Sequence, residues 1–348
     1  MMISYLVEFL LILLLIIVNT TLSAYIPQFS PSFGKQIMKE NASKKSLDKS
    51  KQESSPPLDS QLSPTENQDL SQIKKYLSVF GYLQQNVESF DDVLDKETIS
   101  AIITYQQNFN LKVTGNINDE FLEHIAFPRC GIPDMNLNHG HDTLNVSWPN
   151  GNKWFPKGTK NLSYFIPESE FTLEAMAVLR NALSRWSKIT KVMNFTETPY
   201  DDADIKFGFY NSNDKIEDVV VGFSLIILQQ SSKRKLGVIG FDNIREWVLP
   251  SEYLWSWKFD LESEAMHQIG HLLGLDHSYD EESVMYPTIL PSQQRRVQIT
   301  ASDNQNIQQI YTQSNPTSAH IKSFGFTRSS SVLASSFLLG FVFLFLFN

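Results

Sequence analysis

Three histidines near residue 270 have the spacing of a catalytic metal site. His267 and His271 are four residues apart, so on a helix their imidazoles lie one turn apart on one face, where they can share a metal ion. Gly274 lets the chain leave that helix, because glycine accepts the positive φ of a C-terminal cap. His277 can then return as a third ligand. Three protein ligands with an open fourth position are typical of a catalytic zinc rather than a structural one.

The residue that follows the first histidine is Gln268, at the position where zinc hydrolases with this spacing carry a glutamate as general base. A neutral amide can hold a water molecule by hydrogen bonds but cannot take its proton. Losing a general base costs roughly 10²–10⁴-fold in rate. The alternative is that the three histidines bind no metal. The histidine spacing, Gly274 and the methionine that follows at Met285 together disfavour it. Two hypotheses stay open, a zinc enzyme of impaired activity and a zinc-binding protein that no longer cuts.

The single cysteine, Cys130, lies in the segment Pro-Arg-Cys-Gly-Ile-Pro-Asp, residues 128–134. With one cysteine the chain forms no intramolecular disulfide, and a lone cysteine in a secreted protein needs an explanation. A thiolate can fill the open fourth position of a zinc site and displace its water. Two prolines stiffen the segment, Gly131 permits close approach to a metal, and Arg129 and Asp134 can pair to hold its shape. The alternative is an inert cysteine, which these neighbours disfavour.

These motifs together resemble a known family. The histidine pattern followed by Met285, in a methionine turn, is similar to that of the metzincins. Residues 128–134 resemble the cysteine switch of matrix metalloproteinases, in a form similar to the plant branch, and the resemblance covers about Asp69 to Tyr311. It implies a zinc endopeptidase of extracellular proteins with one catalytic-type zinc, kept latent by Cys130. It also implies an S1′ pocket built on the segment after Pro287.

The elements that must position these residues form two groups. In residues 67–138, apolar side chains at helical spacing predict three short helices, around Leu70 to Phe80, from about Asp95 to Asn108 and from Asp119 to Ile125. The resemblance makes this a peptidoglycan-binding-like prodomain. Taken alone, a three-helix bundle is equally compatible with a carbohydrate-binding or protein-binding module.

Residues 139–312 predict an α+β domain, which the resemblance makes a metzincin catalytic domain, a twisted mixed sheet with long helices. The expected strands are 162–166, 203–209 and 236–242, and the expected helices are 173–189, 259–274 and 300–311. In the first of these helices we expect packing by Ala177, Leu179, Leu183, Trp186 and Ile189.

Two features of this domain depart from the family pattern. The family's second, structural zinc uses three histidines, and no histidine lies between His141 and His267, so we expect that site to be missing. Residues 211–221 are interpreted as a loop without the usual calcium ligands. Asp204 and Asp242 stand at positions that resemble calcium ligands, but calcium prefers 6–8 oxygens. We expect both to be solvated or ion-paired, and calcium binding stays open.

The ends of the chain indicate secretion and attachment to a membrane. Residues 1–23 predict a signal peptide with an apolar run at 9–18, and 24–66 a flexible pro-segment. A polar spacer, 313–331, precedes the uncharged apolar tail 332–348, which is the pattern of a GPI-attachment signal. Ser318 is one candidate attachment residue, with Ser323 and Ser329 as alternatives, and a transmembrane anchor is the competing interpretation. Either anchor predicts the outer face of the plasma membrane, with a GPI lipid in its outer leaflet.

Four N-glycosylation sequons begin at Asn41, Asn145, Asn161 and Asn194, in keeping with a secreted chain. The formal net charge of -9 argues against nucleic acid as a partner. The expected partner is therefore an extracellular or cell-wall protein or peptide, either as substrate or as ligand.

Overall fold

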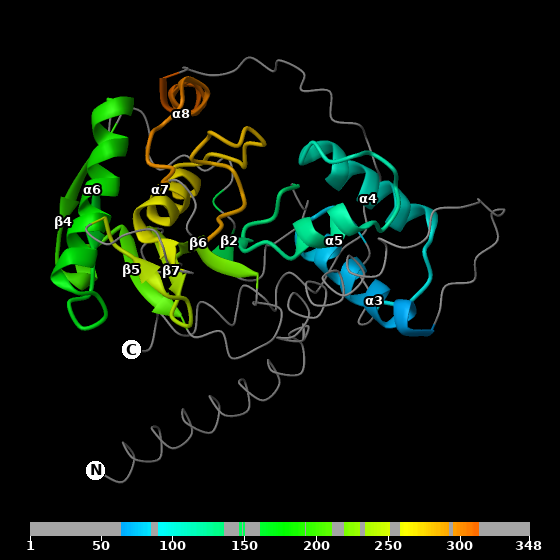
Figure 1. The fold of residues 1–348 in the computed structure, drawn as a ribbon. Helices are drawn as coiled ribbons and strands as arrows, with labels where there is room; N and C mark the ends of the chain where they lie inside the picture. The colour runs from blue at the N-terminus through cyan, green and yellow to red at the C-terminus, as the bar shows by residue number, and fades with distance from the viewer. Residues whose placement is uncertain are drawn as a thin grey trace, which may run out of the picture.

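The computed structural model confirms the expected α+β order, with helices first and a mixed sheet with long helices after them (Figure 1). It describes residues 64–84, 90–135, 146–147, 149, 161–191, 193–210, 219–229, 234–250, 258–291 and 295–312. Within these ranges no helix has the length and apolar character needed to cross a bilayer.

The three predicted N-terminal helices are present as α3 (Pro64–Val79), α4 (Lys96–Asn108) and α5 (Asp119–Ile125). Gly81, with φ +86°, follows the last turn of α3, where a residue without a side chain accepts the positive φ that ends the helix. The Asp95 side chain caps α4 by accepting a hydrogen bond from Thr98 N at 2.7 Å. The three helices pack around the buried ring of Tyr105, whose ring neighbours are Tyr76, Tyr82, Phe109, Phe121 and His124.

The described part of the chain forms a seven-stranded sheet in the order β1-β6-β7-β5-β3-β4, with β2 also on β6. Pairs β2–β6 and β6–β7 are antiparallel and the others are parallel. The strands are β1 (Arg129–Cys130), β2 (Val146–Ser147), β3 (Asn161–Phe165), β4 (Asn194–Glu197), β5 (Ile205–Tyr210), β6 (Val220–Leu228) and β7 (Lys235–Asp242). A short 3-10 helix, η2 (Tyr200–Asp202), precedes β5, and β8 (Trp247–Val248) pairs with β9 (Phe259–Asp260).

Strand β6 corrects the interpretation of residues 211–221 as a loop, since it begins at Val220. All but the last of its residues are buried. A strand covered on both faces is apolar throughout and lacks the alternation that marks a half-exposed strand. The apolar run from Val220 to Leu228 is therefore consistent with a buried strand, which was not predicted.

The long helices α6 (Leu173–Thr190) and α7 (Leu261–Leu272) pack on each other, and α8 (Ala301–Thr312) closes the domain (Figure 1). The Trp186 indole of α6 donates a hydrogen bond to Met266 O of α7 at 3.0 Å, which links the two helices. Leu179, Leu183 and Trp186 are buried as expected.

The expectation that Ala177 and Ile189 pack in the core was wrong, because both are exposed. A helix turns by about 100° per residue, which puts Ala177 on the side opposite Leu179. Ile189 lies in the last turn, at the margin of the apolar stripe, and its side chain is 38% exposed.

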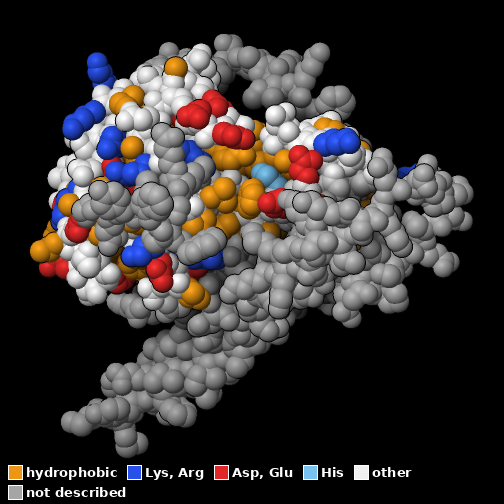
Figure 2. Space-filling view, in the orientation of Figure 1, with side chains coloured by type: hydrophobic (Ala, Val, Ile, Leu, Met, Phe, Trp, Pro, Cys, Tyr) orange, Lys and Arg blue, Asp and Glu red, His pale blue; other side chains and the backbone are white. Residues whose placement is uncertain are grey.

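The second face of the sheet joins the two parts of the molecule. Phe223 and Leu225 of β6 and Val238 of β7 belong to the same buried cluster as Tyr105 and Phe109 of the N-terminal helices. Figure 2 shows apolar side chains, a histidine and several acidic groups around the hollow between the two parts. One continuous core therefore fixes the N-terminal helices against the sheet.

Candidate metal centre and cleft

Helix α7 carries two of the three histidines, and its C-terminal cap brings back the third. Gly274 has φ +100°, its N–H donates to His271 O at 2.7 Å, and Leu275 N donates to Gly270 O at 3.1 Å. This pair of bonds is a Schellman motif, which reverses the chain after the helix. The turn returns His277 to the helix face that carries His267 and His271.

The structure brings the four predicted metal-binding side chains together. Ligand atoms of Cys130, His267, His271 and His277 all lie within 4.8 Å of one another. His267 Nδ1 lies 2.8 Å from Val284 O, and His271 Nδ1 lies 2.8 Å from Leu275 O. A carbonyl oxygen only accepts, so both Nδ1 atoms carry the hydrogen and both Nε2 atoms present lone pairs.

This arrangement suits a cation. The Nε2 atoms of His267 and His271 are 3.0 Å apart, yet two lone pairs cannot form a hydrogen bond. Burial keeps the pKa of both imidazoles well below its ordinary value, so neither ring holds a second proton to share. Neither ring nitrogen of His277 has a hydrogen-bond partner among the described residues. Three imidazole nitrogens are the protein ligands of one type of catalytic zinc site, and a thiolate sulfur is also a zinc ligand.

Cys130 reaches the histidines because its segment lies extended in a cleft. Strand β1 pairs in parallel with the edge of β6, and Gly131 N donates to Gly222 O at 2.9 Å. On the opposite side, Cys130 N donates to Pro287 O at 2.9 Å, and Ile289 N donates to Pro128 O at 3.0 Å. The cleft thus binds an extended peptide by its backbone on both sides. Burial raises the pKa of the Cys130 thiol, and a bound metal ion favours the thiolate instead.

The predicted pairing of Arg129 with Asp134 is confirmed, and both side chains are fully buried. The guanidinium also donates to Tyr76 OH at 3.0 Å and lies 3.7 Å from the centre of the Phe80 ring. Burial raises the pKa of Asp134, but the charge of Arg129, the contact with His277 and the hydrogen bond from Arg129 together lower that pKa to about 2.

Asp134 also reaches the histidine cluster, since its Oδ1 lies 2.7 Å from His277 Nδ1. Burial lowers the pKa of His277 against the raising effect of Asp134, so this contact joins a carboxylate to a neutral imidazole. The segment that carries Cys130 therefore also places a carboxylate behind the third histidine, and such carboxylates orient imidazole ligands.

Met285 lies beneath α7, where Gly270 makes room for it. A Cβ on Gly270 would lie 2.4 Å from Met285 Sδ, so no larger residue fits there without displacing the methionine. The buried side chain of Asp303 in α8 stabilises the turn that contains Met285, because it accepts a hydrogen bond from Ser283 Oγ at 2.6 Å. Asp303 was not among the residues predicted from the sequence.

Gln268 lies beside the cluster and donates a hydrogen bond to a carboxylate, that of Glu264, which was not predicted to belong to the site. Its Nε2 donates to Cys130 Sγ at 3.3 Å and to Glu264 Oε1 at 2.7 Å. Glu264 is one turn earlier on α7 and is only 2% exposed. Burial raises its pKa to about 7, against the opposing effects of the Gln268 hydrogen bond and Arg296. The signal was a glutamate four residues before Gln268, on the same helix face.

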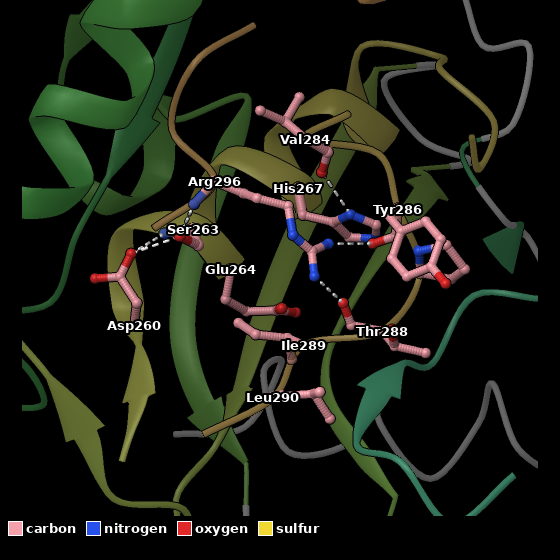
Figure 3. A pocket seen from close by; sticks show the side chains of 11 residues that line it. Asp260, Ser263, Glu264, His267, Val284, Tyr286, Thr288, Ile289, Leu290 and Arg296 are labelled. Carbon is pink, nitrogen blue, oxygen red and sulfur yellow. Dashed lines mark hydrogen bonds between the residues drawn. The ribbon is translucent and has the colours of Figure 1, made fainter. Parts of the chain in front are cut away.

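A cavity of about 20 Å³, room for about one water, adjoins His267 and Glu264 (Figure 3). Its walls include Pro287 and the three residues after it, the segment on which the resemblance places an S1′ pocket. Arg296 closes one side by donating to Tyr286 O at 3.3 Å and to Thr288 O at 2.7 Å. The full lining is Asp260, Ser263, Glu264, His267, Val284, Tyr286, Pro287, Thr288, Ile289, Leu290 and Arg296.

The two candidate calcium ligands are ion-paired, as expected. Asp204 pairs with Arg234 at 2.8 Å, and Asp242 pairs with Arg245 at 3.0 Å. Residues 211–218, which are most of the loop interpreted as lacking calcium ligands, lie outside the described residues. The missing structural zinc therefore stays a prediction.

Two predicted glycosylation residues lie side by side on the sheet edge. Asn161 of β3 pairs with Asn194 of β4, and both are exposed. The asparagines of the other two sequons, Asn41 and Asn145, lie outside the described residues, as do all of residues 1–63 and 313–348, which include the predicted signal peptide, Ser318 and the apolar tail.

Comparison with known proteins gives consistent results. The family model described as Matrixin matches residues 153–312, and that described as Putative peptidoglycan binding domain matches residues 66–125. The chain is 35% identical to Metalloendoproteinase 5-MMP of Arabidopsis thaliana over 261 residues, 70% of this chain and 71% of that protein. It is 36% identical to Metalloendoproteinase 2-MMP of Arabidopsis thaliana, covering 70% of each chain. It is 35% identical to Metalloendoproteinase 1 of Glycine max, covering 70% and 81%.

Proposed function

Because this chain belongs to the matrix metalloproteinase family, of the plant type, we propose that it is a latent zinc endopeptidase with reduced turnover. The observation that carries the proposal is the extended segment 128–131 in the cleft, with the Cys130 thiol on three imidazoles. A cleft that holds one peptide between β6 and the segment after Pro287 can hold a substrate peptide once that segment leaves.

The roles of the residues follow from their contacts. His267, His271 and His277 would hold the zinc, with Cys130 as the fourth ligand of the latent form. Zinc held by these residues would polarise the scissile carbonyl and activate water. Gln268 orients a water molecule through its amide and accepts no proton, which is why we propose a lower rate than for a glutamate at this position.

A second function, binding without cutting, is favoured by one specific observation. The amide of Gln268 stands beside the cluster where the family pattern has a carboxylate. If the protein binds without cutting, its cleft would hold a peptide or a segment of a cell-wall protein, and the protein would act in adhesion or signalling.

A cleavage assay on the full chain separates the two functions. Cys130→Ala frees the fourth ligand position, and in this background we expect about one zinc per chain and slow cleavage of an unfolded protein substrate. His271→Ala should abolish both zinc binding and cleavage. An inert, zinc-loaded Cys130→Ala protein that cuts after Gln268→Glu would support binding without cutting, and a protein that retains no zinc would contradict both functions.

We also propose that the protein acts outside the cell, at the outer face of the plasma membrane. The apolar run at residues 9–18, the uncharged tail at 332–348 and the sequons support this location. A phosphatidylinositol-specific phospholipase should release the protein from cell surfaces, and a protein that stays bound after this treatment would contradict the GPI anchor.

A further inference from the structure

Glu264 is a buried carboxylate beside the candidate metal centre. Neither packing nor ion pairing explains why a carboxylate occupies this position. It is 2% exposed, and its one described hydrogen-bond donor is the neutral amide of Gln268. The nearby guanidinium of Arg296 donates to Tyr286 O and Thr288 O. A buried carboxylate without a bonded cation lowers stability relative to an apolar residue of the same size.

The fold nevertheless reserves space for this carboxylate. A Cβ on Gly222 of β6 would lie 2.3 Å from Glu264 Oε1. Any residue larger than glycine would therefore clash with the carboxylate in its present position. Gly222 is the strand partner of Cys130. The carboxylate therefore reaches the strand edge on which the peptide lies.

The distance from Glu264 to the reacting position is short enough for one bridging water. Gln268 Nε2 lies 2.7 Å from Glu264 Oε1 and 3.3 Å from Cys130 Sγ, so the carboxylate oxygen and the sulfur are at most about 6 Å apart. A general base can act directly or through one water. Once Cys130 leaves, water can take the place of the sulfur, and the adjoining cavity has room for about one more.

The surroundings set the proton affinity of Glu264 in the range that such a role requires. Its pKa of about 7, raised by burial, allows a carboxylate both to accept and to release a proton near neutral pH. The charged or titratable groups that face it are Arg296, which favours the ionised form, and Cys130, His267 and Asp260 around the same space.

We propose that Glu264 is the general base of this site, in place of the residue at position 268. In the proposed step the attacking water gives one proton, through a bridging water, to the Glu264 carboxylate as its oxygen bonds to the peptide carbonyl carbon. When the C–N bond breaks, Glu264 returns that proton to the leaving amine nitrogen. Gln268 orients the attacking water. This inference rests on the proposed endopeptidase function.

The test uses the full chain in the Cys130→Ala background. Glu264→Gln should lower kcat/KM by roughly 10²–10⁴-fold, with zinc content and KM unchanged. The double variant Glu264→Gln, Gln268→Glu moves the carboxylate by one turn and should restore at least the rate of the parent. Glu262→Gln is the matched control, because Glu262 is a buried carboxylate of the same helix that pairs with Arg185 and Arg295. It should keep the rate within about threefold of the parent.

A second readout needs neither zinc nor turnover. In the zinc-free protein, the infrared difference between parent and Glu264→Gln should show a carboxyl band that disappears as pH rises through about 7. A Glu264→Gln variant that cuts as fast as the parent would overturn the assignment of Glu264 alone. A zinc-loaded parent that is inert until Gln268→Glu is introduced would also overturn it and leave the zinc site intact. A parent without zinc would overturn the endopeptidase function itself.

Discussion

The buried pair between Arg129 and Asp134 should control the exposure of Cys130, and Asp134→Asn tests this. The substitution keeps the size of the side chain and removes its charge, which leaves the Arg129 guanidinium buried beside Tyr76 and Phe80 without a counter-charge. Breaking a buried pair from one side costs about 3–5 kcal/mol.

The pKa of Asp134 gives a second estimate of this cost. Holding that pKa at about 2 instead of 3.8 favours the ionised carboxylate by roughly 2 kcal/mol. We take about 3 kcal/mol, the lower end of the first range, which corresponds to roughly a 10²-fold higher population of the state in which the segment has left the cleft.

The reaction of the thiol with a disulfide reagent measures that population, because Cys130 is the only cysteine in the chain. We expect Asp134→Asn to react roughly 10²-fold faster than the native chain. The control is Glu197→Gln at the surface pair with Arg180, where both side chains are more than a third exposed. Such pairs contribute at most about 1 kcal/mol, so this variant should leave the thiol rate unchanged.

The pH dependence of the thiol rate follows from the same pKa. The folded pKa lies below the unfolded one, so the stabilisation is complete above about pH 4 and is lost as pH falls toward 2. Measured relative to the denatured chain at the same pH, which corrects for the falling thiolate fraction, the Cys130 rate of the native chain should therefore rise only in that window. A thiol rate that is the same in Asp134→Asn and in the native chain would refute the reasoning.

Three further predictions concern other contacts. Gly270→Ala forces Met285 Sδ away from a Cβ only 2.4 Å distant, so urea unfolding should show a loss of about 1–3 kcal/mol, and an unchanged midpoint would contradict the packing. Glu264 binds its proton more tightly when folded, with a pKa of about 7 against 4.5, so the zinc-free native chain should lose about 3 kcal/mol of stability between pH 4.5 and 7, whereas thermal unfolding of Glu264→Gln should lack that loss. Tyr279→Phe removes the hydroxyl that accepts Asn108 Nδ2 at 2.8 Å, which should weaken prodomain docking by about 0.5–1.5 kcal/mol and speed the thiol reaction up to about tenfold, and a slower reaction would argue against this contact.

Local sequence signals predicted most of the helices and the spacing of the site. The histidine spacing, Gly274 and the capped helices depend on interactions within about one helical turn, which a sequence displays directly. Strand β6 was missed because both of its faces are covered, so its apolar run shows no alternation. Ala177 and Ile189 were misplaced because their burial depends on which side of α6 meets its neighbours.

The sequence by itself determined which groups can bind metal, which thiol can block them, and that position 268 carries no base. Only the tertiary structure decided what surrounds these groups. It put Asp134 behind His277 although 143 positions separate them, and it laid Cys130 between β6 and the segment after Pro287. It also buried Glu264 against Gly222, where loss of water raises the pKa to about 7. Desolvation and the pairing of distant groups depend on the packed fold, so no local pattern in the chain records them.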